Sequence, residues 1–292
     1  MDFASMMQLE QHGPDTYVGV GPSYPWGGLY GGQIVAQALR AASLTVDPTF
    51  HVHSLHAYFI RLGDSSEPIR FEVDRLRNGR TFATRHVVVR QAVGAILNLE
   101  ASFQVPEEGV EVQTATLGDI PGHDELPATS WSPVFDRRVV PTGGEPGRAI
   151  SWMQMVEPLG DDQHLQACGL AYLSDDFPTE AVVMQHPDRR LIPEAAEGEF
   201  PFWSASLDHA VWFHRPFRAD AWHVHDFVCH GLLSSRGLAV GTVYRRRRPR
   251  GDGRPRGPAA QTSPQLSNPG RSRHGRSRHG RLRIDRADSV GM

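Results

Sequence analysis

The same order of elements, one helix followed by a series of strands, occurs twice along this sequence. In the first half, a helix of mostly small apolar residues is predicted over 33–42, directly after Gly31 and Gly32. Strand-like segments then follow at 53–61, 69–76, 81–90 and 95–105. The pair Asn78-Gly79 predicts a tight hairpin, and the short connections indicate antiparallel neighbours. The first half is therefore predicted to be a helix packed on an antiparallel sheet.

The second half repeats this order with one strand fewer. A helix is predicted at about 162–175, and strands follow at 205–217, 222–233 and 237–244. The segment Tyr58-Phe59-Ile60-Arg61 has its counterpart in Trp212-Phe213-His214-Arg215. We therefore predict two related α+β units, over 1–105 and 146–244, joined by a linker or crossover at 106–145 that is rich in Pro, Gly and Thr. The last strand of the second unit is expected to be missing or replaced.

Residues 245–292 differ from the rest of the chain in charge. The net charge of −3 conceals a segment with 14 Arg against three acidic residues, and this segment has no hydrophobic periodicity. Such a composition buries too little apolar surface to offset the entropy of ordering, so a disordered tail is predicted. Clustered Arg can also bind phosphate, but a solvated tail is the simpler interpretation, and nucleic acid is not expected as a partner.

The charge of the sequence changes at residue 245, where the last strand of the second unit is expected. We therefore hypothesise that the tail is a frameshift product. Residues 245–258 can be encoded by codons that, read one nucleotide later, give Asp-Ala-Asp-Gly-His-Val-Ala-Thr-Val-Ala-Gln-Glu-Val. That reading is a polar turn followed by an apolar strand with one Gln. The nucleotide sequence around codons 244–258 tests this hypothesis.

Several classes of protein are not expected from composition. The opening residues 1–7 lack the basic and apolar regions of a signal peptide, and no run of about 18 apolar residues occurs, so a cytoplasmic protein without a membrane span is expected. Cys168 and Cys229 are the only cysteines and lie far apart, which excludes a disulfide framework and a cysteine zinc site. His51, His53 and His56 lack a neighbouring acid at metal-ligand spacing, so no metal site is predicted.

Four longer motifs carry a family resemblance. They are Gly31-Gly32-Gln33-Ile34-Val35-Ala36-Gln37-Ala38, His53-Ser54-Leu55-His56-Ala57-Tyr58-Phe59-Ile60-Arg61, Ala171-Tyr172-Leu173-Ser174-Asp175 and Ser206-Leu207-Asp208-His209-Ala210-Val211-Trp212-Phe213-His214-Arg215-Pro216-Phe217. In this order they resemble the acyl-CoA thioesterase II (TesB-like) family. The resemblance implies an α+β double hotdog, in which two antiparallel sheets each wrap a long helix and pair into one sheet. It further implies acyl-CoA as substrate, no cofactor, and a homo-oligomer.

The resemblance also implies the chemistry and some of its residues. The family hydrolyses acyl-CoA with a water molecule held by an Asp, a Thr or Ser hydroxyl, and a Gln. By motif position the Asp is Asp175, with Asp176 as the alternative if the alignment slips. The hydroxyl position falls on His230, counted from Trp222, and a histidine can also hydrogen-bond a water. The family's Gln belongs to the strand that is expected to be missing, so it is assigned to neither Gln261 nor Gln265.

The glycine-rich segment before the first helix has two interpretations. It lacks the pattern of a nucleotide-binding loop, and in a hotdog its glycines would permit a close backbone approach and amide donors toward the thioester. Gly32 is the candidate donor. Two other functions remain open: an enoyl-thioester hydratase, for which no His/Asp or His/Glu hydration motif is found, and an acyl-CoA-binding protein whose activity is impaired by the altered C-terminus.

Overall fold

A computed structural model describes residues 1–189, 202, 204–245 and 258–267, and within 258–267 it describes only the Thr262 side chain. The first half contains α1 (Phe3–Met6), β1 (Glu10–Gln11), β2 (Thr16–Gly19), α2 (Gly31–Ser43), β3 (His51–Phe59), β4 (Ile69–Asn78), β5 (Phe82–Gln91) and β6 (Gly94–Gln104). The second half contains a 3-10 turn η1 (His123–Glu125), β7 (Phe135–Val140), β8 (Arg148–Met155), α3 (Gln163–Leu173), α4 (Pro178–Gln185), β9 (Ala205–Phe213), β10 (His223–Leu233), β11 (Arg236–Arg245) and β12 (Pro258–Ser267).

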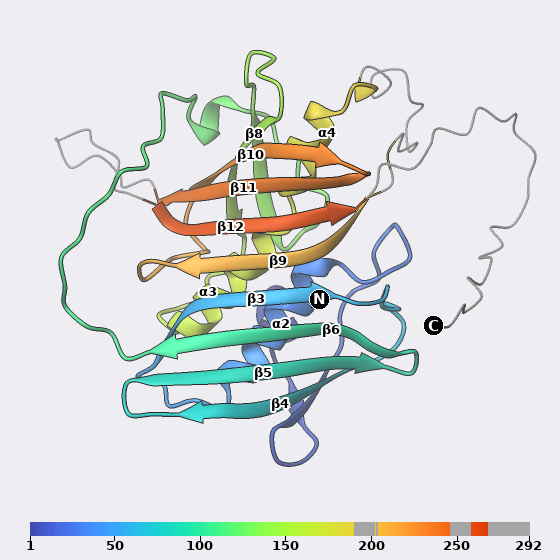
Figure 1. Ribbon diagram of the computed structural model, residues 1–292, viewed down its shortest axis with the longest axis vertical. Helices are drawn as coiled ribbons and strands as arrows, with labels where there is room; N and C mark the ends of the chain where they lie inside the picture. The colour runs from blue at the N-terminus through green and yellow to red at the C-terminus, as the bar shows by residue number, and fades with distance from the viewer. Residues whose placement is uncertain (190–201, 203, 246–257, 268–292) are drawn as a thin grey trace, which may run out of the picture.

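All of these strands belong to one antiparallel sheet with an internal symmetry. The strand order is β1-β2-β4-β5-β6-β3-β9-β12-β11-β10-β8-β7. From the centre outward, β3-β6-β5-β4-β2 on one side corresponds to β9-β12-β11-β10-β8 on the other. Figure 1 shows β3-β6-β5-β4 below the centre of the sheet and β9-β12-β11-β10 above it. The predicted duplication is thus present as two related halves, and the Asn78-Gly79 hairpin joins β4 to β5 as predicted.

The two halves join through β3 and β9. Ser54 pairs with Trp212 and Ala57 pairs with His209, so the two matching motifs lie side by side at the centre of the sheet. Backbone hydrogen bonds at this seam continue the sheet without an edge. A residue of β9 can therefore be brought close to elements of the first half.

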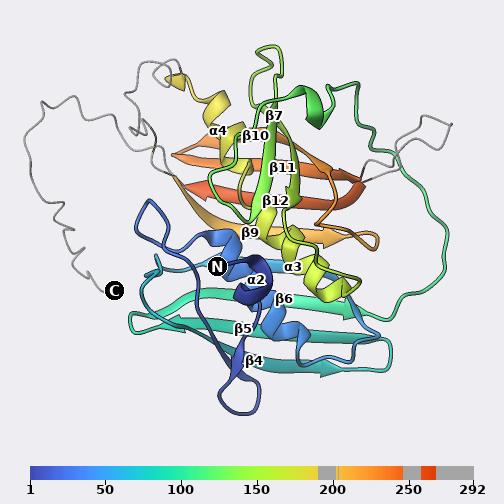
Figure 2. The ribbon, with the colours of Figure 1, turned by 180° about the vertical axis from the view of Figure 1, so that it is seen from behind.

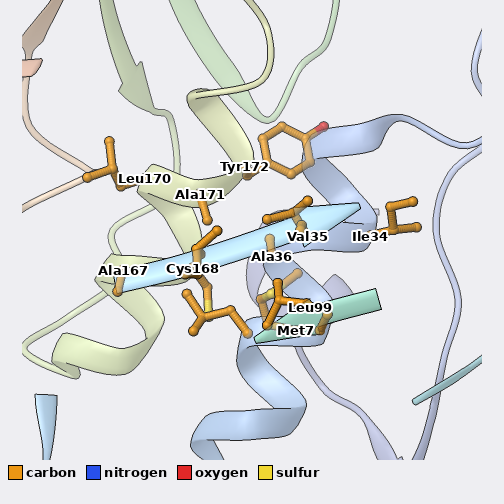
Figure 3. Packing of buried hydrophobic residues seen from close by; sticks show 14 of the residues in the cluster. Met7, Ile34, Val35, Ala36, Leu99, Ala167, Cys168, Leu170, Ala171 and Tyr172 are labelled. Carbon is orange, nitrogen blue, oxygen red and sulfur yellow. The ribbon is translucent and has the colours of Figure 1, made fainter. Parts of the chain in front are cut away.

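Helices α2 and α3 lie against the same face of the sheet, as Figure 2 shows. Their contact is made by small side chains, among them Ala36 of α2 with Cys168 and Ala171 of α3, which are fully buried (Figure 3). Small side chains allow two helix backbones to approach closely. The alanine-rich composition of α2 therefore sets how near the ends of the two helices come to each other.

The second half contains a last strand after all. Residues 258–267 form β12, which pairs with β11 on one side and β9 on the other. Of the two expectations, that this strand is missing or that it is replaced, absence is therefore wrong: β12 occupies the place that β6 holds in the first half, and replacement stays a prediction. The predicted disorder of the tail is also wrong for this segment, because its backbone completes the sheet. The remaining tail residues, 246–257 and 268–292, lie outside the described residues.

The predicted linker also contains structure that its sequence does not reveal. Within it, β7 adds a strand to the edge of the sheet beside β8. Leu117, Ile120 and Leu126 pack on the outer face of the sheet around Trp152, whose indole N–H donates to the Pro121 carbonyl oxygen at 2.9 Å. The crossover therefore covers the sheet face opposite the helices. None of the described helices is long and apolar enough to cross a membrane.

Candidate active site

The N-terminus of α2 meets the C-terminus of α3, and glycines make this approach possible. A Cβ atom on Gly32 would lie 2.3 Å from the Tyr172 carbonyl oxygen, and one on Gly31 would lie 2.4 Å from Oδ2 of Asp175. The Tyr30 hydroxyl donates to the same Tyr172 oxygen at 2.8 Å. Side chains at Gly31 and Gly32 would therefore collide with residues of the second half. Because these glycines belong to the first half, both halves build this site.

Asp175 lies directly beyond α3 and faces the N-terminus of α2. Helix α2 has Tyr30 as its N-cap, no capping side chain and no acidic residue in its first turn. Its first amides are therefore unsatisfied by the helix itself, and the positive end of its dipole favours a carboxylate. The Asp175 carboxyl occupies this place, and it also accepts a hydrogen bond of 2.8 Å from the Ser206 hydroxyl on β9.

The environment of Asp175 is suited to a general base near neutral pH. Burial raises the pKa of Asp175 to about 7, and the Asp176 charge adds to this rise, while the Ser206 hydroxyl and the Gly32 amide oppose it. Asp175 is only 8% exposed. A carboxyl with this pKa is available as a proton acceptor around pH 7 and binds the proton strongly enough to take it from water.

The neighbouring Asp176 is in a different environment. Its Oδ2 lies 2.8 Å from Nη1 of Arg137 in a largely buried ion pair, and its Oδ1 accepts the indole N–H of Trp131. Both carboxylate oxygens are therefore bound by partners within the second half. This arrangement favours a structural role for Asp176, and the choice of Asp175 as the base stays a prediction.

His209 stands beside Asp175 on β9. Its Nδ1 lies 3.9 Å from Oδ1 of Asp175, and its Nε2 lies 2.8 Å from the Ser174 hydroxyl. The side chain is buried, and burial lowers its pKa to about 4, so it is neutral at pH 7. Asp175, Ser206, His209 and Ser174 thus form one connected polar group in an otherwise apolar interior.

The other sequence-predicted residues are placed differently. The amide of Gly32 donates a hydrogen bond to the Asp175 carboxyl, and its predicted role toward the thioester stays a prediction. His230 is exposed on β10, at a bulge between Cys229 and Gly231, and strands β11 and β12 separate β10 from β9. The structure therefore does not bring His230 to Asp175. Gln261 and Gln265 lie on β12, where only their backbone register is described.

Ser206 and His209 are the site residues that sequence analysis missed. Both stand in the motif that begins at Ser206, so the hydroxyl was present in the quoted sequence. Counting residues from Trp222 instead places the hydroxyl position on the following strand, at His230. The only signal was the position of Ser206 at the start of a motif, and the sequence does not show that β9 starts beside the end of α3.

Within the described part of the chain, no cluster of three His, Cys, Asp or Glu side chains could hold a metal ion. Cys229 does not form a nucleophilic pair with His230 either, because its thiol contacts the Gly231 carbonyl and burial raises its pKa.

The buried histidines predict acid sensitivity. Burial lowers the pKa of His209 and His223 to about 4, and that of His225 well below its ordinary value of 6.5. Between pH 6.5 and 4 the unfolded chain therefore binds more protons at these residues, so stability falls as the pH falls. The raised pKa values of Asp175 and Glu180 act in the opposite direction as the pH falls, whereas burial also lowers the pKa values of His51, His53 and His214, which adds to the loss of stability.

Urea unfolding at pH 7 and pH 5 measures this effect. We expect the free energy of unfolding to be lower at pH 5 by on the order of 3 kcal/mol. His230→Gln is the matched control, because His230 is exposed. It should leave the difference between the two pH values unchanged. Equal stability at pH 7 and pH 5 in the parent chain would show that the buried histidines do not titrate in this way.

Two family models match the chain along most of its length. Residues 21–104 match the model described as acyl-CoA thioesterase N-terminal domain, and residues 108–249 match the acyl-CoA thioesterase C-terminal domain. The boundary between the two matches falls where β6 ends and the crossover begins.

Curated relatives and solved structures agree with these matches. The chain is 31% identical over 241 residues to acyl-CoA thioesterase 2 of Haemophilus influenzae, covering 74% of this chain and 82% of that protein. It is 29% identical over 276 residues to human acyl-coenzyme A thioesterase 8, covering 82% of this chain and 83% of the relative. The crystal structure of an acyl-CoA thioesterase II, TesB2, from Mycobacterium marinum is similar with a TM-score of 0.76 and 32% identity, covering 91% of this chain and 97% of that one.

Proposed function

The chain belongs to the acyl-CoA thioesterase II family, with its N- and C-terminal hotdog domains, and from this premise we propose that it hydrolyses acyl-CoA to a free fatty acid and CoA through a water molecule activated by Asp175. The observation that carries the proposal is the placement of Asp175. It is a buried carboxyl with a pKa of about 7, between the N-terminus of α2 and the Ser206 hydroxyl.

The proposed reaction needs no covalent intermediate. The water oxygen attacks the thioester carbonyl carbon while the water proton passes to the Asp175 carboxylate. The resulting tetrahedral intermediate collapses, the carbon–sulfur bond breaks, and the CoA thiolate leaves and takes up the proton from Asp175, which returns to its carboxylate form. A thiolate is a good leaving group, so an oriented base and donors for the oxyanion can suffice.

Ser206 takes the hydroxyl role in this proposal, in place of His230. Its O–H donates to Oδ1 of Asp175 and so restrains the carboxylate, while the Ser206 oxygen can accept a hydrogen bond from the attacking water. A serine fits the Thr or Ser that the family resemblance implies. His230 is exposed on another strand, so we assign it no part in the reaction.

A substitution pair tests this assignment. Ser206→Ala removes the hydroxyl that positions the base and water, so we expect kcat to fall roughly 10- to 100-fold with little change in Tm. The matched control is His230→Ala, which should leave kcat within about twofold of the parent value. The assignment would be reversed if the His230 variant lost activity and the Ser206 variant kept it.

The main experiment is turnover of acyl-CoA of several chain lengths with detection of the released thiol, beside calorimetric measurement of acyl-CoA binding. Thiol release supports hydrolysis. Binding without thiol release would favour the impaired acyl-CoA-binding protein. Conversion of an enoyl-CoA to a hydroxyacyl-CoA without thiol release would favour the hydratase.

A further inference from the structure

His209 is buried, and the groups around it determine which titratable side chain it can influence. In the sheet it lies between Ala57 of β3 and Pro264 of β12, and neither of these residues titrates. From the end of α3 it is faced by Ser174 and Asp175. Asp176, which follows Asp175 in the chain, is held in its ion pair with Arg137. Asp175 is thus the titratable carboxyl that His209 faces directly.

The direction in which the Ser174 hydroxyl donates is coupled to which nitrogen of His209 carries the proton. A neutral imidazole has one N–H. Ser174 Oγ lies 2.8 Å from Nε2 of His209 and 3.1 Å from the Ala171 carbonyl oxygen, so its hydrogen can be donated to either. If it is donated to Nε2, the imidazole proton must be on Nδ1. If it is donated to Ala171, the imidazole proton is on Nε2 and Nδ1 presents a lone pair.

The charge of Asp175 discriminates between these two arrangements. Nδ1 is fully buried without a hydrogen-bond partner, and it faces Oδ1 of Asp175 at 3.9 Å. When Asp175 is ionised, a lone pair on Nδ1 repels the carboxylate and an N–H attracts it, and the apolar surroundings strengthen both effects. The arrangement with Ser174 donating to Nε2 and the proton on Nδ1 is therefore favoured whenever Asp175 is a base.

We propose that His209, held by Ser174 in its Nδ1–H tautomer, is a positioning residue that stabilises the ionised form of Asp175 and fixes the direction of its carboxylate. The proposal rests on the proposed function of Asp175 as base. His209 remains neutral throughout and exchanges no proton with the substrate. Its contribution is a fixed dipole aimed at Oδ1 of the carboxylate.

Three variants separate this role from a merely structural one. His209→Leu keeps a similar volume and removes both nitrogens. His209→Asn keeps an N–H bonded to Cγ, as Nδ1 is, and so can still donate toward Asp175. Ser174→Ala removes the partner of Nε2 and leaves the tautomer undefined, and it serves if the leucine variant fails to fold.

The readout is the pH dependence of kcat/KM, which in the parent should rise through the pKa of Asp175, near pH 7. We expect His209→Leu to move this limb to higher pH by about one unit, so that activity falls about tenfold more at pH 6 than at pH 9. His209→Asn should restore the limb to within about 0.3 units, and Ser174→Ala should lie between the two. Equal loss at all pH values in the leucine variant, or an asparagine variant that behaves like it, would overturn the proposal.

A second measurement does not depend on catalysis. Infrared difference spectra against Asp175→Asn follow the carboxyl of Asp175 as it titrates, and His209→Leu should raise its midpoint by the same amount. If Asp175→Asn keeps full activity, the proposed function fails whatever His209 does. If that variant is inactive while the carboxyl midpoint ignores His209, only the present inference fails.

Discussion

The Asp175→Asn variant is expected to fold like the parent chain and to hydrolyse acyl-CoA two to four orders of magnitude more slowly, which is the usual contribution of a positioned base. An amide has nearly the size of the carboxyl and can still accept the Ser206 hydrogen bond, so the contact with β9 persists. It cannot take a proton from water at neutral pH. Thiol release under saturating acyl-CoA measures kcat, and thermal melting verifies the fold.

Asp176→Asn is the matched control for this prediction. It lies one residue away, and its carboxylate is bound by Arg137 and Trp131. Removing a buried partner of Arg137 leaves its charge uncompensated, so the expected effect is a lower Tm rather than a lower kcat. If Asp175→Asn loses less than about threefold in kcat with unchanged melting, and Asp176→Asn loses the activity instead, the base is Asp176.

Much of this fold could be predicted from the sequence. The helix at 33–42 and the strands of the first half agree with α2 and β3–β6 to within a few residues, because each amphipathic period is a local property of the chain. The family and the double hotdog, predicted from four motifs, are confirmed by the family models and by similar solved structures. Hydrophobic periodicity and long motifs are the features from which a single sequence predicts its elements and its family directly.

The features that were not predicted depend on contacts between distant segments. β7 has no clear alternation because its outer residues are covered by other parts of the crossover, so its sequence does not look half-exposed. Ser206 becomes a site residue only because β9 begins beside the end of α3. Asp175 has the same dependence: by sequence it follows a helix C-terminus, where a carboxylate gains nothing, and only packing shows that it faces the N-terminus of α2.

The symmetry of the sheet gives an independent reason to compare the two reading frames that could encode the strand at the place of β12. In the first half only Ala92 and Val93 separate β5 from β6, whereas residues 246–257 separate β11 from β12. The alternative frame supplies an Asp-Ala-Asp-Gly turn directly after Tyr244, which would give the second half an equally short hairpin. The match to the C-terminal family model also ends at residue 249, close to this point.

The register then places the Gln of the alternative frame. Ala101 of β6 pairs with Leu55 of β3. In the motif match between the two halves, Leu55 corresponds to His209. The number of residues from Gly to Gln in the alternative frame equals the number from Gly94 to Ala101. By symmetry this Gln would lie opposite His209, next to Asp175. In the 292-residue chain that position holds Pro264, whose backbone nitrogen carries no hydrogen.

We therefore expect the restored-frame chain to turn over acyl-CoA roughly 100-fold faster than the 292-residue chain, because the family resemblance gives this Gln a part in holding the attacking water, and a misplaced reactant typically costs about 100-fold in rate. Pro264→Gln in the 292-residue chain should recover part of this gain, and Pro264→Leu, its matched control, none. Parallel kcat measurements on the four chains, with sequencing of the nucleotides around codons 244–258, decide the matter. Equal turnover of both frames would show that a Gln opposite His209 is dispensable. A +1 frame that encodes no Gln-bearing strand would leave β12 as the natural strand.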